Sequence, residues 1–207
     1  MLSVRTLTFE EKKYMNWKNA YLHWKKIRIH RKWVRHYCWK QGLYWQGLIH
    51  DLSKYSPTEF FESVKYYQGD SSPIVAAKKD QGYSLSWQHH KGRNPHHYEY
   101  WTDNYDTGGT VLLMPYKYFV EQICDYVGAA RAYMGKDFSY IKELEWWKAR
   151  KSRKLAMHPR IIQMMDIIFN DLAANEILYE DGISTHGPED LMADKKYFKN
   201  VYEANKE

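Results

Sequence analysis

Apolar residues recur at the helical period along most of the 207-residue chain. The clearest stretch is 116–134, where apolar side chains lie three or four positions apart at Phe119, Val120, Ile123, Val127 and Ala130. Strict alternation of polar and apolar residues, which is typical of half-buried strands, is nearly absent, so no sheet is expected. The pattern predicts an all-α fold.

Capping residues and helix breakers divide this pattern into segments. Thr8 and Glu11 have the spacing of a capping box, and the next glycine is Gly42, so one long helix or two abutting helices should precede it. Ser56-Pro57 is typical of a helix start. The predicted helices lie at about 8–40, 43–54, 57–69, from 72 onward, 116–134, 139–152, 159–179 and 187–204.

The stretch 91–115 interrupts the helical pattern with three glycines and two prolines. It predicts an irregular loop, and loops of this length are more often functional than accidental. No linker or internal repeat divides the chain, so residues 1–207 are expected to form a single helical domain.

Composition narrows the classes of partner. The formal net charge is +6, and much of the excess lies at 25–40 and 148–154, which favours anionic partners such as phosphorylated substrates or nucleic acid. Solvated helix faces are the alternative explanation. Cys38 and Cys124 imply no disulfide framework. No signal-peptide segment and no apolar run of about 20 residues occurs, so we expect a cytoplasmic protein without a membrane partner.

The candidate chemistry centres on His50-Asp51, which lies between Leu48, Ile49 and Leu52 and is therefore expected to be buried. A buried carboxylate beside an imidazole is costly unless it is paired or bound to a metal. Imidazole nitrogen and carboxylate oxygen together suit a divalent transition metal such as Mn, Fe, Co, Ni or Zn.

Further candidate ligands lie on both sides of this pair. Upstream, His30 and Val34 are one helical turn apart and share a face. Downstream, Asp125 lies inside an apolar helical stretch, on the same face as Glu121 and Gly128; a solvent-facing Asp125 is the alternative. Four histidines also fall within nine residues, at positions 89, 90, 96 and 97.

In this order, His30-x-x-x-Val34, His50-Asp51-x-x-Lys54 and Asp125 resemble the H…HD…D signature of the HD superfamily of metal-dependent phosphohydrolases. The resemblance covers about 25–135 and implies an HD-domain-like helical bundle, with 136–207 as a C-terminal helical extension. His-Asp-Leu-Ser-Lys followed by His89-His90-x-x-x-Asn94-Pro95-His96-His97 is also similar to a small, functionally uncharacterised family of bacteria and phages.

The resemblance implies metal ligands at His30, His50, Asp51 and Asp125. The extra histidines look like the ligands with which some superfamily members hold a second ion, Asp51 then bridging the two. Their crowding into one short segment departs from the familiar spacing. Among them His90 and His97 are favoured, followed by His96, whereas His23 and His36 are not expected to be ligands.

Two ions about 3.5–4 Å apart can activate water for phosphoester hydrolysis. We therefore expect a metal-dependent phosphohydrolase acting on a nucleotide or another small phosphoester, with Asp51, Lys54 and Arg93 as catalytic residues. Lys54 and Arg93 would contact phosphate, although Lys54 has an equally good explanation as a lysine at a helix end. The alternatives are a di-iron oxygenase on the same scaffold and, less favoured, a basic helical nucleic-acid-binding module.

Overall fold

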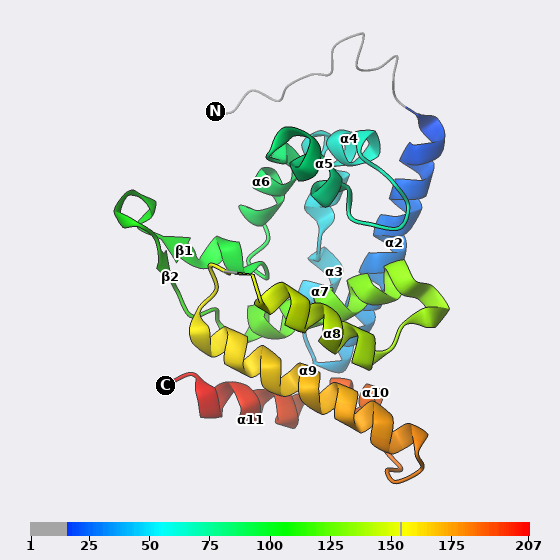
Figure 1. The fold of residues 1–207 in the computed structure, drawn as a ribbon, viewed down its shortest axis with the longest axis vertical. Helices are drawn as coiled ribbons and strands as arrows, with labels where there is room; N and C mark the ends of the chain where they lie inside the picture. The colour runs from blue at the N-terminus through cyan, green and yellow to red at the C-terminus, as the bar shows by residue number, and fades with distance from the viewer. Residues whose placement is uncertain (1–15, 154) are drawn as a thin grey trace.

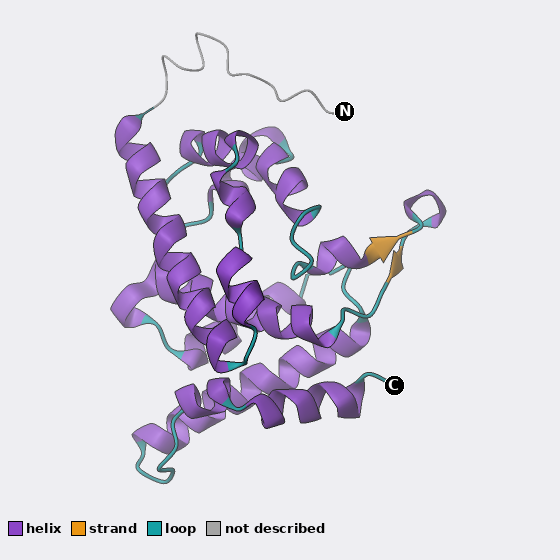
Figure 2. Cartoon of the chain, turned by 180° about the vertical axis from the view of Figure 1, so that it is seen from behind, coloured by secondary structure: helices purple, strands orange, loops and turns teal. Residues whose placement is uncertain are grey.

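The computed structural model describes residues 16–153 and 155–207, so the cap predicted at Thr8 lies outside the described residues. Helices dominate the described part, and the all-α prediction is confirmed (Figures 1 and 2). The α-helices are α2 (Trp17–Lys40), α3 (Tyr44–Ile49), α4 (Pro57–Lys65), α5 (Pro73–Gln81), α6 (Leu85–Lys91), α7 (Tyr116–Met134), α8 (Tyr140–Lys151), α9 (Pro159–Glu180), α10 (Pro188–Ala193) and α11 (Lys195–Asn205). Short 3-10 helices are η1 (Leu52–Tyr55), η2 (Tyr98–Trp101), η3 (Tyr105–Thr107) and η4 (Gly135–Asp137).

Helices α2 and α7 form the central pair. Their contact face is fully buried at Val34, Ile123 and Val127. Gly128 makes the close approach possible, because a Cβ at this position would lie 2.6 Å from Val34 Cγ2 and 3.1 Å from the Val34 backbone nitrogen. The pairing fixes His30 on α2 relative to Asp125 on α7.

The C-terminal helices continue the same core. Helix α9 packs against α8, α10 and α11 beneath the central pair (Figure 1). Its buried apolar residues belong to one contiguous cluster with those of α2 and α7. Tyr202 on α11 donates a hydrogen bond to the Met114 carbonyl at 2.7 Å, which ties the last helix to the segment just before α7.

Helices α4 and α6 lie side by side and present a second set of site residues. Ser56 caps α4, accepting a hydrogen bond from the Glu59 backbone nitrogen, and Pro57 occupies the first turn as predicted. Glu62 then accepts from the Leu85 and Ser86 nitrogens at 3.1 and 2.6 Å. A carboxylate at the N-terminus of α6 is favourable, and it holds the histidine-bearing helix against α4.

Three predictions about the elements that precede α7 were wrong. The helix predicted over 43–54 ends at Ile49, and the chain resumes as η1 after Asp51, whose φ is 55°. The stretch 91–115 is not wholly irregular: strands β1 (Thr102–Asp103) and β2 (Thr110–Val111) pair in antiparallel fashion. Residues with positive φ at Asn104, Gly108 and Gly109 make this reversal possible. Helix α4 also ends at Lys65, four residues before Gly69.

In the described part of the chain, no helix combines the length and the apolar character that crossing a bilayer requires.

Candidate metal centre

The turn at His50-Asp51 points both side chains into the interior. Asp51 adopts a left-handed backbone conformation, which costs a non-glycine residue about 1–3 kcal/mol. Arg31 holds the turn from α2: its Nε donates to the His50 carbonyl and its Nη2 to the Leu48 carbonyl, both at 2.8 Å. His50 and Asp51 are 1% and 0% exposed. The break in the helix therefore positions the pair.

A first cluster joins α2, the end of α3 and α7 through His30, His50, Asp51 and Asp125. His30 Nε2 lies 3.0 Å from Asp51 Oδ2 and 3.2 Å from Asp125 Oδ1. His50 Nε2 lies 3.3 Å from His30 Nε2 and 3.4 Å from Asp51 Oδ2. Two imidazole nitrogens and two carboxylate oxygens thus face one common point.

A second cluster consists of Asp51, His90, His96 and His97, with one ligand atom from each lying within 4.8 Å of the others. Asp51 Oδ1 is 3.2 Å from His90 Nε2 and 3.5 Å from His96 Nε2. His90 Nε2 lies 2.9 Å from His97 Nε2. His96 is thus as much a member as the two histidines that the sequence favoured, whereas His89 is not among these four residues.

Asp51 belongs to both clusters, and its two oxygens are divided between them. Oδ2 faces His30 and His50, whereas Oδ1 faces His90 and His96. Asp125 adds a weaker link, because its Oδ2 lies 4.0 Å from His96 Nε2. A carboxylate placed in this way can bridge two ions.

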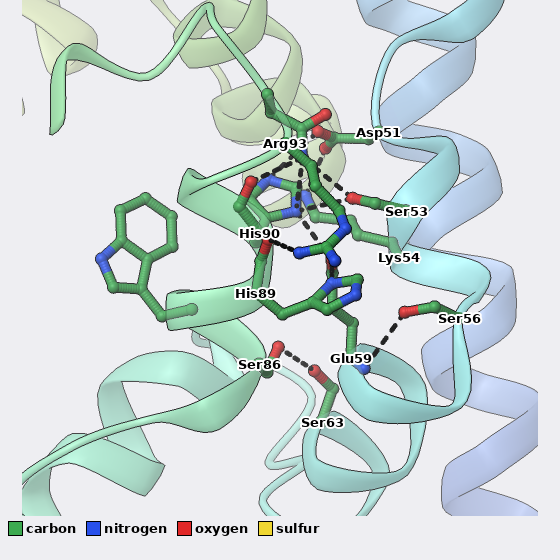
Figure 3. Close-up of polar contacts among 12 residues, drawn as sticks. Asp51, Ser53, Lys54, Ser56, Glu59, Ser63, Ser86, His89, His90 and Arg93 are labelled. Carbon is green, nitrogen blue, oxygen red and sulfur yellow. Dashed lines mark hydrogen bonds and ion pairs between the residues drawn. The ribbon is translucent and has the colours of Figure 1, made fainter. Parts of the chain in front are cut away.

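Two glutamates, which the sequence did not identify as site residues, orient the histidines. Glu121 Oε1 lies 3.0 Å from His50 Nδ1 and 3.1 Å from His96 Nδ1. Glu59 Oε2 lies 2.7 Å from His90 Nδ1, and its Oε1 lies 2.6 Å from His89 Nδ1, as Figure 3 shows. A carboxylate that accepts a hydrogen bond from Nδ1–H keeps the proton on Nδ1 and leaves the Nε2 lone pair for a metal.

The signal for Glu121 was its position four residues before Asp125, on one face of α7. Glu59 has no comparable signal, because its partner histidines lie about thirty residues further along the chain. Glu121 also comes close to His50 and His96 as a third group of potential ligands. We assign it to orientation, because it contacts their Nδ1 atoms and not the Nε2 atoms that converge on Asp51.

The buried carboxylates of the centre face charged histidines, because burial would lower the pKa values of His50 and His90 but Asp51 raises both. Burial alone would raise the pKa values of the carboxyls, but the neighbouring histidines lower the pKa of Glu121 to about 2 and hold those of Asp51 and Asp125 well below 3.8. Glu59 is shifted in the same direction, mainly by His90. The four carboxylates are therefore ionised at neutral pH while they are almost fully buried.

Unpartnered atoms show that the donor set fits a cation. Asp51 Oδ1 and His96 Nε2 are buried without a hydrogen-bond partner, although they lie 3.5 Å apart. Burial, together with His96 and His90, holds the pKa of His97 well below 6.5, so this imidazole is neutral, the form that binds metals. Histidine nitrogens with carboxylate oxygens are suitable ligands for a divalent transition metal.

The two predicted phosphate-binding residues differ in placement. Lys54 Nζ contacts Asp51 Oδ2 at 2.5 Å, and its side chain is 25% exposed. Burial would lower its pKa, but Asp51 and Asp125 raise it, so the ammonium stays charged. Arg93 is exposed and donates from Nη1 to the His89 carbonyl at 3.3 Å (Figure 3). It belongs to neither cluster.

The two histidines excluded as ligands also lie outside the clusters. His23 is buried against the rings of Phe60 and Tyr67, with centroid separations of 5.5 and 5.7 Å. His36 is exposed beside Trp33. Neither contributes a ligand atom to either group.

Comparison with known proteins gives a family but no activity. A family model described as a family of unknown function, DUF5662, matches residues 19–171, which include every member of both clusters. No curated protein and no solved structure matches the chain. Because the family match spans well over half of the 207 residues, the chain belongs to the DUF5662 family.

Proposed function

We propose that this protein is a metal-dependent phosphohydrolase that acts on a nucleotide or another small phosphoester. The observation that carries the proposal is Asp51, whose two oxygens face two separate groups of ligand atoms. When bound, two ions so placed would supply a water nucleophile at neutral pH and would stabilise negative charge on the phosphoryl group.

The residues of the chain have distinct parts in this proposal. His30, His50, Asp51 and Asp125 would hold one ion, and Asp51 with His90, His96 and His97 would hold the other. Glu121 and Glu59 keep the imidazoles in the required orientation. The burial of these histidines and carboxylates keeps bulk water away from them and so strengthens each electrostatic contact.

Lys54 is our candidate for binding the substrate phosphate. Its ammonium contacts the shared carboxylate of Asp51, yet its side chain remains partly exposed, so an incoming anion can reach it. Arg93 lies further out, on the surface beside His89. Binding of the substrate phosphate by Arg93 therefore stays a prediction, because the hydrogen bond of Arg93 goes to the His89 carbonyl and not to a cluster residue.

The order of the ligands also supports membership of the HD superfamily, which we include in the proposal. The histidine comes from α2, the His-Asp pair from the end of α3 and the last aspartate from α7. The extra histidines come from the end of α6 and the segment that follows it.

A di-iron oxygenase is the second candidate. It is favoured by the composition of the second cluster, in which three imidazoles accompany one carboxylate. Histidine-rich sets with a carboxylate suit iron as well as manganese or zinc. Bound iron with a mixed-valence spectrum would support the oxygenase, whereas phosphate release from nucleotides on addition of Mn²⁺ would support the hydrolase.

Elemental analysis of the purified protein tests the metal centre first. His50→Ala and Asp51→Ala should each abolish metal content while circular dichroism remains helical. His36→Ala is the matched control, because His36 is exposed and outside both clusters. Unchanged metal stoichiometry in both variants at the centre would refute the metal site, and a metal-loaded protein that releases no phosphate would refute the hydrolase alone.

A further inference from the structure

A groove lies on the outer side of α2. This groove has a volume of about 520 Å³ and is formed by α2 together with Gly47 of α3 and Tyr55 of η1. Its lining from α2 includes Trp24, Arg28, Arg31 and Arg35. From Trp24 to Arg35 the groove extends about 16 Å along the helix axis, at 1.5 Å per residue.

The groove is positively charged, and its basic side chains have no acidic partner among the described residues. No aspartate or glutamate occurs between residues 17 and 50, and Asp51 is fully buried. Lys25, Arg28, Lys32 and Arg35 all line the groove, and none of them forms an ion pair with any residue in 16–153 or 155–207. Such a surface attracts polyanions.

Aromatic rings accompany the guanidinium groups along this side of α2. Arg28 lies 4.6 Å from the centroid of the Trp24 ring, and Arg31 lies 5.4 Å from that of Tyr55. At the end of the groove, Arg35 lies 5.7 Å from the Trp39 ring. Aromatic side chains in a basic groove are the combination on which the unpaired bases of single strands stack.

The groove and the metal centre lie on different sides of α2. His30 faces the centre, and Arg28, two residues earlier, points about 200° away around the helix. Arg31 links the two sides, because it lines the groove and its Nε also donates to the His50 carbonyl. A ligand of the groove therefore does not need the metal.

We propose that this groove binds single-stranded nucleic acid, with the basic side chains on the phosphates and the aromatic rings against the bases. A duplex keeps its bases stacked and so cannot use the rings. A flat anionic membrane fits poorly because the arginines line a hollow in the surface.

Fluorescence anisotropy with the full chain and a labelled 12-nucleotide single strand, as DNA and as RNA, tests the proposal. Arg28→Glu/Arg35→Glu should weaken binding at least tenfold, and the slope of log Kd against log salt should fall by about 1.4, as expected for two lost phosphate contacts. Lys196→Glu/Lys199→Glu on α11 changes the net charge equally and should leave Kd within twofold. Trp24→Leu should weaken binding about fivefold without changing the salt slope.

Three outcomes would overturn the proposal. If both double variants weakened oligonucleotide binding equally, the attraction would come from diffuse charge and not from the groove. If a duplex bound as tightly as the single strand, stacking of bases on the aromatic rings would be excluded. Binding to phosphatidylserine vesicles without binding to the oligonucleotides would identify a lipid surface. Metal content, which should be unchanged in the groove variants, separates failure here from failure of the proposed hydrolase.

Discussion

Glu121 offers the sharpest test of how the metal centre is built. One oxygen of this carboxylate contacts Nδ1 of His50 and Nδ1 of His96, and these two histidines belong to different clusters. Removing its charge should therefore lower metal affinity at both positions. Glu59 contacts only His90 among the cluster histidines, so Glu59→Gln should weaken the second position alone.

The magnitude follows from the hydrogen bonds. Loss of an outer partner of a metal-bound histidine costs about 10–100-fold in affinity. Glu121→Gln keeps the size and one acceptor oxygen but loses the charge, which makes such hydrogen bonds about twice as strong as neutral ones. We expect about a tenfold loss at each position. Glu121→Leu leaves two buried N–H donors unpaired, at about 1–3 kcal/mol each, and should approach the hundredfold limit.

Competition with a chromophoric chelator, monitored for Zn²⁺ and Mn²⁺, gives the stepwise dissociation constants. Glu143→Gln is the matched control, since Glu143 is also a buried glutamate but belongs to neither cluster. If Glu121→Gln changed only one constant, or if Glu59→Gln lowered both equally, the assignment of these glutamates to particular histidines would be wrong.

Three further perturbations test the fold and the chemistry. Gly128→Ala forces a Cβ against Val34, which should cost about 1–3 kcal/mol of overpacking, whereas the better helix propensity of alanine gains about 0.5–1 kcal/mol. The free energy of unfolding in urea should therefore fall, and an unchanged or higher value would contradict the close approach of α2 and α7. Burial, reinforced by the Asp125 carboxylate, raises the pKa of Glu143 to about 8. Between about pH 4.5 and 8 the folded state keeps a proton that the unfolded state has released, so stability falls as the pH rises through this range. Relative to the parent protein, Glu143→Gln should therefore gain up to about 4 kcal/mol from pH 5 to pH 8.5 in urea unfolding, and an equal difference at both pH values would contradict the shift. Lys54→Met should lower kcat/KM for a phosphomonoester about 10–100-fold with metal content retained, whereas Arg93→Met should cost at most about fivefold; the reverse ranking would exchange their roles.

Local periodicity predicted several of the regular helices, but the helix predicted over 187–204 is divided at Asp194 into α10 and α11. Helix α7 spans the predicted range 116–134, and α9 extends one residue beyond the predicted 159–179. The helix break at Asp51 could not be found in this way, because neither glycine nor proline marks it. Its causes are tertiary: Arg31 on α2 binds the carbonyls of the turn, and the partners of Asp51 come from distant segments. The two-residue strands β1 and β2 are likewise too short for an alternating pattern to appear.

In the site too, the residues that could be predicted differ from those that only tertiary packing brings together. His30, His50, Asp51 and Asp125 could be grouped from their order in the chain, and the structure brings them together. The segment carrying His96 and His97 follows the end of α6 and has no helical period, so the sequence could not rank these residues reliably. Glu59 was out of reach, because only the packing of α4 against α6 brings it to His90.

The electrostatics of the centre link metal binding to folding. Four ionised carboxylates lie buried within one set of contacts, where the Lys54 ammonium and the imidazoles of His50 and His90, whose pKa values Asp51 raises against the effect of burial, offset part of their charge. Buried charges of one sign are costly unless cations or hydrogen bonds compensate them, and the left-handed turn at Asp51 adds its own cost. An ion bound only by the folded chain stabilises it by about 2.7 kcal/mol at a hundred times Kd. Because the ligands come from α2, α6, α7 and the segments that follow α3 and α6, that free energy would be shared by the elements that build the central core, and not by one loop.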